Sequence, residues 1–221
     1  MSTGTIESRG GEWSKVSDGP SFQPDDWMAS MRTPLEFPGH PFWDFSLEVY
    51  AREGVADACL RLQDDLGIDV NILLFCCWVG RSGGGELGER TIADAAGAVG
   101  SWNDEIVRPL RRLRRRLKGG FTGVREERSL ELRREIQAIE IESEHIEQLF
   151  LGETFARADD EKLPAEIRAG HAAVNVAAYL RVSGAAGTAG HLRGIGTLLA
   201  ATFPDLKGEV LDVAMSSAWG K

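Results

Sequence analysis

The sequence predicts an all-α protein: a single helical bundle of about seven or eight helices that includes a long antiparallel helix hairpin. Apolar residues recur three or four positions apart through most of the chain after residue 40. No segment before residue 165 alternates as a strand would, and glycines and prolines fall at the ends of the periodic segments. We expect the helical domain to span residues 39–221 and residues 1–38 to form an irregular N-terminal tail.

The composition excludes several classes of protein. The chain has 221 residues, of which 43% are hydrophobic, which is enough for a packed core. Its formal net charge of −9 makes nucleic acid an unfavourable partner, because phosphates repel an acidic protein. The longest apolar run covers only residues 72–79, whereas a transmembrane segment needs roughly 20 residues. The first residues lack the basic-then-apolar order of a signal peptide, so we expect a cytoplasmic protein.

Helix caps and breakers divide the first part of the domain. Pro41 suits the first turn of a helix, Gly67 a C-terminal cap and Asp69 an N-terminal cap. The segment after Asp69 is apolar nearly all round, which predicts a central, buried helix. A glycine-rich loop is expected over 80–89. The helices predicted here cover 41–53, 55–66, 70–79 and 91–99.

Residues 101–151 have the clearest periodicity. One helix is predicted to continue to residue 118, and Pro109 is expected to kink it or to start a second segment. Glycines at 119, 120 and 123 predict a turn, and the long helix that follows has an apolar stripe interrupted by Ser143. This arrangement predicts an antiparallel hairpin with coiled-coil-like packing. The apolar positions are Ile106, Leu110, Leu113 and Leu117 on the first arm, and Leu132, Ile136, Ile139, Ile146 and Phe150 on the second.

The last third predicts two helices, over 165–182 and 191–202, joined by glycines and alanines. Residues 182–190 are similar to the glycine-rich phosphate loop of a dinucleotide-binding domain. That loop should precede about 100 residues of alternating strands and helices, and only 31 residues follow Gly190. We therefore interpret this stretch as a tight turn with close helix contact.

No metal or cofactor site is predicted. An odd number of cysteines, Cys59, Cys76 and Cys77, indicates buried reduced thiols, with a reactive thiol pair as the alternative. The chain has no Cys-x-x-Cys, and no histidine lies within four residues of a cysteine. Glu142 and His145 form one Glu-x-x-His, half of a di-iron motif, but no second copy exists.

The first candidate site is a polar set at the junction of the second and third helices. Carboxylates and amides that converge there could bind Mg²⁺ or Ca²⁺, or carry out acid–base chemistry. The spacing differs from that of an EF-hand loop. The alternative is that Asp69 caps the third helix and that Asn71 bonds a neighbouring backbone group in the core. The set consists of Gln63, Asp64, Asp65, Asp69 and Asn71.

The second candidate is a basic helix face opposite the leucines of the first hairpin arm. Such a face can bind phosphates, an anionic lipid surface or an acidic protein. The alternative is pairing with the glutamates at 140–147. A turn near residue 120 would place the arginines beside the charge-balanced residues 122–135, so we expect the face to stay partly free. It consists of Arg108, Arg111, Arg112, Arg114, Arg115, Arg116 and Lys118.

Two stretches carry a family resemblance. Residues 42–78 read FWDFSLEVYAREGVADACLRLQDDLGIDVNILLFCCW, and residues 102–118 read WNDEIVRPLRRLRRRLK. They resemble a family of uncharacterised bacterial proteins catalogued as a domain of unknown function, with the pattern FW-x-FSL-x-VY, ACL-x-LQD, G-x-DVN-x-LL and PLR-x-LRR. The resemblance covers roughly residues 41–151. It implies a bacterial cytoplasmic protein, and it implies no activity, cofactor or catalytic residue.

The charge segregation favours a non-catalytic helical binding or adaptor protein, with a protein partner or a second copy of the chain. The alternative is an enzyme or small-ligand-binding protein with a polar pocket near Asp64, Asp69 and Asn71. Geometry distinguishes the two. An adaptor would use those three side chains for caps and backbone contacts, whereas an enzyme or ligand-binding protein would direct them into a cavity.

Overall fold

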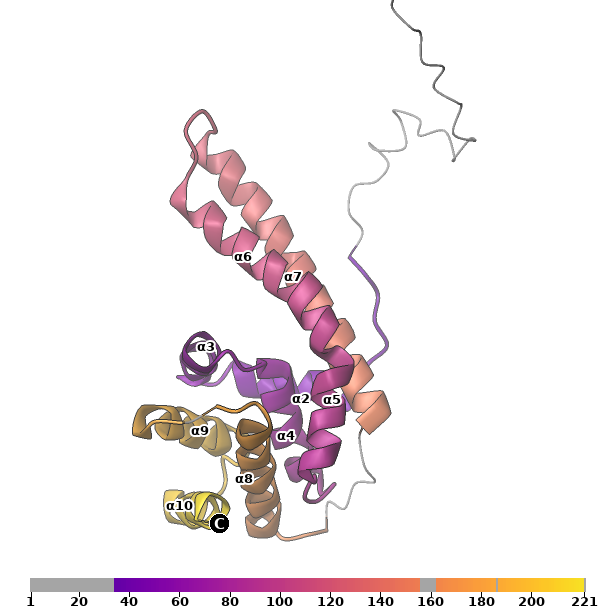
Figure 1. Ribbon diagram of the computed structural model, residues 1–221, viewed down its shortest axis with the longest axis vertical. Coiled ribbons are helices and arrows are strands. Elements are labelled where there is room, and N and C mark those ends of the chain that lie inside the picture. The colour runs from indigo at the N-terminus through magenta and orange to yellow at the C-terminus, as the bar shows by residue number, and fades with distance from the viewer. Residues whose placement is uncertain (1–33, 156–161, 186, 221) are drawn as a thin grey trace, which may run out of the picture. The chain divides into compact units, whose positions relative to one another are not determined.

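The computed structural model describes residues 34–155, 162–185 and 187–220 (Figure 1). The chain divides into two units, Met1–Phe37 and Pro38–Lys221. Residues 34–37 of the first unit have no regular secondary structure. The rest of the predicted N-terminal tail, apart from residue 38, lies outside the described residues. All described helices belong to the second unit.

The second unit is an all-α bundle, as the sequence predicted, and every regular element among the described residues is helical. Short π- and 3-10-helical segments, Asn103–Val107 and Leu117–Gly119, flank α6. The α-helices are α2 (Pro41–Tyr50), α3 (Val55–Leu66), α4 (Val70–Ser82), α5 (Glu89–Trp102), α6 (Arg108–Arg116), α7 (Glu126–Phe155), α8 (Ala165–Val182), α9 (Ala189–Thr202) and α10 (Gly208–Trp219).

The predicted caps of the first helices are confirmed. Gly67 ends α3 with a φ of +67°, a left-handed conformation that glycine adopts without strain. The Asp69 side chain accepts a hydrogen bond of 2.8 Å from the backbone N–H of Asn71 and so caps α4. The chain turns between these two caps. The C-terminal end of α3 and the N-terminal end of α4 therefore meet at the junction where the sequence predicted a polar site.

The centre of the bundle is α4, whose residues 71–80 are all buried. It packs against α8, while α3 packs against α9 and α10 packs against α8 (Figure 1). The backbones of α4 and α8 approach closely, because a Cβ atom added to Gly80 would lie 2.6 Å from the Cα atom of Ala172. α4 is therefore apolar on nearly all sides because it lies at the centre of the bundle, as predicted.

The three cysteines lie in this core as free thiols, as predicted. Burial raises the pKa of Cys59 to about 12 and that of Cys77 to about 12 as well. Burial also raises the pKa of Cys76 above its usual range. All three are therefore protonated at neutral pH and act as small apolar side chains.

The predicted hairpin is present, with α6 beside the first part of α7 (Figure 1). The π-helical turn at Asn103–Val107 ends just before α6, and Pro109 lies in the first turn of that helix. The backbone stays helical from α5 through this turn into α6, and the Arg108 N–H donates to the Asn103 carbonyl five residues back. Of the two outcomes expected at Pro109, the structure does not have the separate start of a second segment; a π-helical turn accommodates the proline within a continuous helical run.

The predicted apolar packing of the hairpin is wrong in part. Leu117 and Ile136 are buried, but Leu113 is 48% exposed and Leu132 is 52% exposed. The buried side of α7 is largely polar instead. These groups tolerate burial because they find partners: Ser129 Oγ donates to the Leu117 carbonyl over 3.1 Å, for example. The buried polar residues of α7 are Ser129, Glu140, Ser143, His145, Glu147 and Gln148.

The last three helices complete the bundle. α8 has the predicted bounds, and α9 begins two residues earlier than predicted. α10 was not predicted, although Leu211, Ala214 and Ala218 are buried on one face at helical spacing. None of the described helices combines the length and the apolar character that crossing a membrane requires.

Candidate ligand-binding site

The two candidate sets from the sequence meet in space. Arg111 Nη1 donates to Gln63 Oε1 over 2.6 Å, and Arg115 Nη2 donates to Asp64 Oδ1 over 2.9 Å. Arg108 Nη2 donates to the Gly67 carbonyl over 2.7 Å. The basic face of α6 therefore lies against the C-terminal end of α3, a contact between residues more than 40 positions apart.

Arginines of α6 and glutamates of α7 form a buried ion-pair network. Arg111 Nε lies 3.0 Å from Glu140 Oε1, and Arg114 Nη2 donates to the same oxygen over 3.1 Å. Arg114 also pairs with the second oxygen of Glu140, and Arg111 pairs with Glu144. The Glu140 side chain is only 5% exposed. Two guanidinium groups thus compensate one buried carboxylate, which satisfies the strong requirement that a buried charge be paired.

The expectation that the arginines lie beside residues 122–135 is therefore wrong for Arg111 and Arg114. The end of the basic face does lie there, since Ser129 Oγ donates to the Leu117 carbonyl. The hairpin loop continues to Arg125, and α7 begins only at Glu126. The middle of the turn lies after residue 120. Each residue of α6 therefore lies beside a residue of α7 that is further along the sequence than expected. This register brings Arg111 and Arg114 to the acidic segment that was expected to lie beyond them.

The outer part of the basic face remains without carboxylate partners among the described residues. Arg112 and Lys118 are exposed and make no hydrogen bond or ion pair within that part of the chain. Arg116 donates to the Gly120 carbonyl over 3.4 Å and lies 4.0 Å from the centre of the Phe121 ring. Arg108 pairs with Asp104 over 3.2 Å on its own helical turn. Arg108, Arg111, Arg114 and Arg115 thus have carboxylate partners, whereas Arg112, Arg116 and Lys118 have none among the described residues.

The polar set at the α3–α4 junction is divided as well. Asp69 caps α4, and its own N–H donates to the Tyr179 hydroxyl over 2.7 Å. Asn71 Oδ1 accepts from Gln148 Nε2 over 2.8 Å in the core. Asp64 pairs with Arg115 at the surface. Among the residues described, no group of histidine, cysteine, aspartate and glutamate could hold a metal ion.

A cavity of about 320 Å³ opens where α2, α3 and α4 meet the hairpin; we call it the hairpin-base cavity. Its exposed margin is apolar and comes from α2, α3 and α7: Leu47, Tyr50, Leu60 and Ile141. Its polar walls include Asn71, Arg111, Arg114, Glu140, Glu144 and Gln148. An apolar entrance with a few convergent polar groups is the usual construction of a small-molecule site.

One wall of this cavity carries an unsatisfied acceptor. The Gln148 side chain belongs to a residue that is 3% exposed, and its Oε1 atom has no hydrogen-bond partner. It is the only side chain of the described cavity wall with a buried polar atom in that condition. Leaving a buried acceptor unpaired costs about 1–3 kcal/mol, so a ligand that donates to this oxygen would recover that free energy.

Glu144 is the cavity side chain whose charge changes near neutral pH. One oxygen pairs with Arg111, and the side chain is 26% exposed. Burial raises the pKa of Glu144 to about 7, and Glu140 adds to the rise while Arg111 opposes it. A carboxyl group with such a pKa can take up or release a proton under ordinary conditions.

Glu147 was expected only as one of the glutamates at 140–147 that could pair with the basic face, and its burial was missed at the level of sequence. The residue is 1% exposed, and its Oε2 atom accepts from Asn103 Nδ2 over 3.3 Å. Burial raises the pKa of Glu147 well above its ordinary value, with a further contribution from Asp69. It is therefore a neutral acid at pH 7. The only sequence signal was Ser143, which interrupts the apolar stripe and shares the buried face of α7 with Glu147.

His145 has a structural role in the bundle. Its ring stacks on Trp43 with the ring centres 3.8 Å apart and the planes 5° apart. Burial lowers the pKa of His145, and His40 lowers it further. The pair holds α2 against α7 on the side of the hairpin-base cavity that Trp43 lines.

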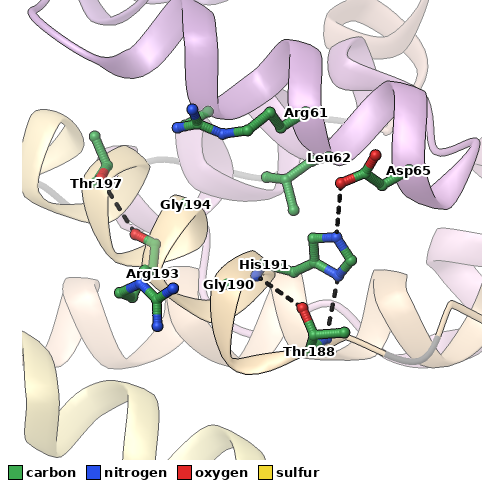
Figure 2. A pocket seen from close by; sticks show the side chains of 10 residues that line it. Arg61, Leu62, Asp65, Thr188, Gly190, His191, Arg193, Gly194 and Thr197 are labelled. Carbon is green, nitrogen blue, oxygen red and sulfur yellow. Dashed lines mark hydrogen bonds and ion pairs between the residues drawn. The ribbon is translucent and has the colours of Figure 1, made fainter.

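A second hollow of about 470 Å³ lies between α3 and α9 (Figure 2). His191 Nε2 lies 3.1 Å from Asp65 Oδ2, and its Nδ1 atom accepts from the Thr188 N–H over 3.1 Å (Figure 2). Thr188 Oγ1 in turn accepts from the His191 N–H, which completes a capping box. The end of the glycine-rich stretch therefore serves to start α9, in agreement with its interpretation as a turn.

The fold and the cavity define an all-α protein with a polar site at the base of a helix hairpin. The chain belongs to the family described as "Protein of unknown function (DUF2390)", whose model matches residues 41–151. That match begins at the first residue of α2 and contains every residue that lines the hairpin-base cavity. No curated protein and no solved structure matches the chain.

Proposed function

We propose that the protein binds a small ligand in the hairpin-base cavity. The observation that carries the proposal is Gln148, a residue of the cavity wall whose side-chain oxygen is buried and unpaired. The apolar margin supports it, because exposed apolar side chains grouped around a concave polar site favour a ligand with an apolar portion.

The ion-pair network supports the same proposal. Arg111 and Arg114 are fixed by Glu140, and Arg111 also bonds Gln63. Side chains that are already held in place lose little conformational freedom when a ligand binds, which favours affinity. Of the three residues that were to distinguish the two functions, Asp64 and Asp69 are engaged elsewhere, whereas Asn71 lines the cavity and bonds Gln148 of the same wall.

The proposal is tested by a fragment screen that includes amines, acids and neutral compounds and follows the ¹H–¹⁵N spectrum of the protein. We expect bound fragments to shift the indole signal of Trp43 and the side-chain amide signal of Gln148. Ile141→Trp would cover the exposed margin and weaken binding at least tenfold, while Leu132→Trp on the exposed side of the same helix would not. Fragments that bind both variants equally, or no bound fragment at all, would contradict the proposal.

We propose docking of an acidic protein as a second candidate function, in the manner of an adaptor. Arg112, Arg116 and Lys118 support it, since none has a carboxylate partner among the described residues. A cytoplasmic location is part of this proposal and is supported by three buried cysteines that form no disulfide. Changing the three basic residues to glutamine should weaken capture of the partner and its salt dependence. Unchanged capture would exclude this face.

A further inference from the structure

Given the proposed function, on which this inference rests, we propose that the ligand of the hairpin-base cavity carries a primary ammonium group on a short apolar body. The ammonium group would donate to Gln148 Oε1 and to the Glu144 carboxylate, and the apolar body would lie against the exposed margin. An ammonium group has three N–H donors and no acceptor, which suits a wall that holds an unpaired acceptor and a carboxylate.

The buried protein atoms without a hydrogen-bond partner indicate whether the head group of the ligand is a donor or an acceptor. No buried nitrogen of Arg111 or Arg114 lacks a hydrogen-bond partner, so these guanidinium groups leave no buried donor unsatisfied. The Gln148 oxygen is buried and unsatisfied. A ligand carboxylate would bring further acceptors to a wall that already has an unpaired one, and it would leave the Gln148 oxygen without a donor.

The charges around the cavity favour a cation. Glu140 and Glu144 line it, and Asp69 lies close enough to Glu144 to raise its pKa. Arg111 and Arg114 also line the cavity, so with Glu144 ionised the charged groups of its wall balance, two against two. Asp69 is a further negative charge near Glu144, which favours an ammonium group over a carboxylate.

Binding of a cation should therefore depend on the protonation of Glu144. Because the pKa of Glu144 lies at about 7, most of the population is neutral at pH 6 and most is ionised at pH 8. An ammonium group beside it favours the ionised form, so binding releases a proton and strengthens as pH rises. The charged and titratable groups that face Glu144 are Arg111 and Arg114 from α6, Glu140 from α7, Asp69 at the start of α4 and Tyr50 from α2.

Three six-carbon probes with different head groups test this inference: hexylamine, hexan-1-ol and hexanoate, each titrated into the full-length protein at pH 6 and pH 8. Hexylamine should bind more tightly than the other two and shift the Gln148 amide signal. Its dissociation constant should fall about tenfold from pH 6 to pH 8, as expected for one carboxyl group with a pKa between them. Hexanoate binding more tightly than hexylamine would overturn the inference.

Two variants test whether Glu144 causes the pH dependence of hexylamine binding. Glu144→Gln should weaken hexylamine binding at pH 8 and abolish its pH dependence. Glu153→Gln, the same change at an exposed position of the same helix, should preserve both. A pH dependence that survives in Glu144→Gln would overturn the inference, and if that variant fails to fold, the comparison of the three probes on the natural protein decides. Binding of other fragments in the cavity without hexylamine would refute the ammonium ligand alone, whereas no bound fragment of any class would refute the proposed function.

Discussion

The α4–α8 and α6–α7 interfaces join helix pairs by opposite means. At α4–α8 most of the buried side chains are apolar, and Gly80 lets the backbones approach until a Cβ atom would overlap Ala172. At α6–α7 the contact is made by long charged side chains, with Arg111 and Arg114 closing on Glu140. The first interface depends on close packing and the second on ion pairs. A larger side chain should therefore destabilise the first, and removal of a charge should destabilise the second.

The difference also separates framework from site. The close α4–α8 contact belongs to the buried core, whereas the hairpin-base cavity lies beside the charged side chains of α6 and α7. Polar groups placed at a contact between a core helix and a hairpin can both hold the hairpin and present donors and acceptors to a ligand.

The largest effect is expected in the apolar region. Leu73→Asp would place an unpaired charge in the centre of α4, where the natural side chain is fully buried, and should unfold the domain. Leu113→Asp, at a half-exposed position of the hairpin, should change the free energy of unfolding by only about 0.5 kcal/mol. Thermal unfolding followed by circular dichroism makes the comparison. A native melting temperature for Leu73→Asp would contradict the central position of α4.

A smaller effect tests the close approach of α4 and α8. Gly80→Ala should destabilise the protein by about 1–3 kcal/mol, because the added methyl group meets the Ala172 backbone. Gly97→Ala is the matched control in the interior of α5, where nothing lies within 4 Å of the new atom. There alanine should stabilise the helix by about 0.5–1 kcal/mol. Urea unfolding of both variants measures the difference, and equal effects would show that the two sites are not distinct.

The buried acid of the polar region should appear in the pH dependence of stability. The folded state raises the pKa of Glu147 above its ordinary value of 4.5, so above that pH it binds a proton that the unfolded state has lost. Stability should therefore fall as pH rises above about 4.5, by at most about 1.4 kcal/mol per pH unit for one proton. Glu144 acts in the same direction up to about pH 7. Glu147→Gln keeps the neutral form and should flatten this decline; an unchanged slope would show that Glu147 is not the group responsible.

The smallest effect is expected at the outer basic face. Arg112→Gln combined with Lys118→Gln should change the free energy of unfolding by less than about 0.5 kcal/mol, because neither side chain has a partner among the described residues. Arg111→Gln should destabilise the protein clearly more, since it leaves Glu144 without its arginine. Guanidinium unfolding of the two variants provides the measurement. A larger loss in the Arg112 and Lys118 variant would reverse the division of the face.

Much of the apolar region could be predicted from the sequence. The caps at Gly67 and Asp69 and the bounds of α8 follow from residue type and spacing, because local hydrogen bonding and helical period determine them. α10 could have been found by the same method, since its buried residues have regular helical spacing. The residues of α10 therefore predict a helix as clearly as those of α8 do.

The polar region could not be predicted in the same way. The hairpin register depends on the length of the loop before Glu126, and periodicity alone does not determine that length. Which face of α7 is buried was misjudged, because a period counts apolar side chains and cannot show that Glu140 and Glu147 have partners across the interface. The pairing of Arg115 with Asp64 is a tertiary contact, and neither the sequence of α6 nor that of α3 predicts it.

The most direct test of this account is a double-mutant cycle between Arg114 and Glu140. Glu140 is the carboxylate that Arg114 contacts, with both its oxygens engaged. The free energies of unfolding of Arg114→Met, Glu140→Leu and the double variant give the coupling between the two side chains. A pairing interface predicts that the double variant is at least about 1 kcal/mol more stable than the sum of the single losses implies. Strictly additive losses would contradict the claim that the arginines of α6 hold the hairpin to the bundle.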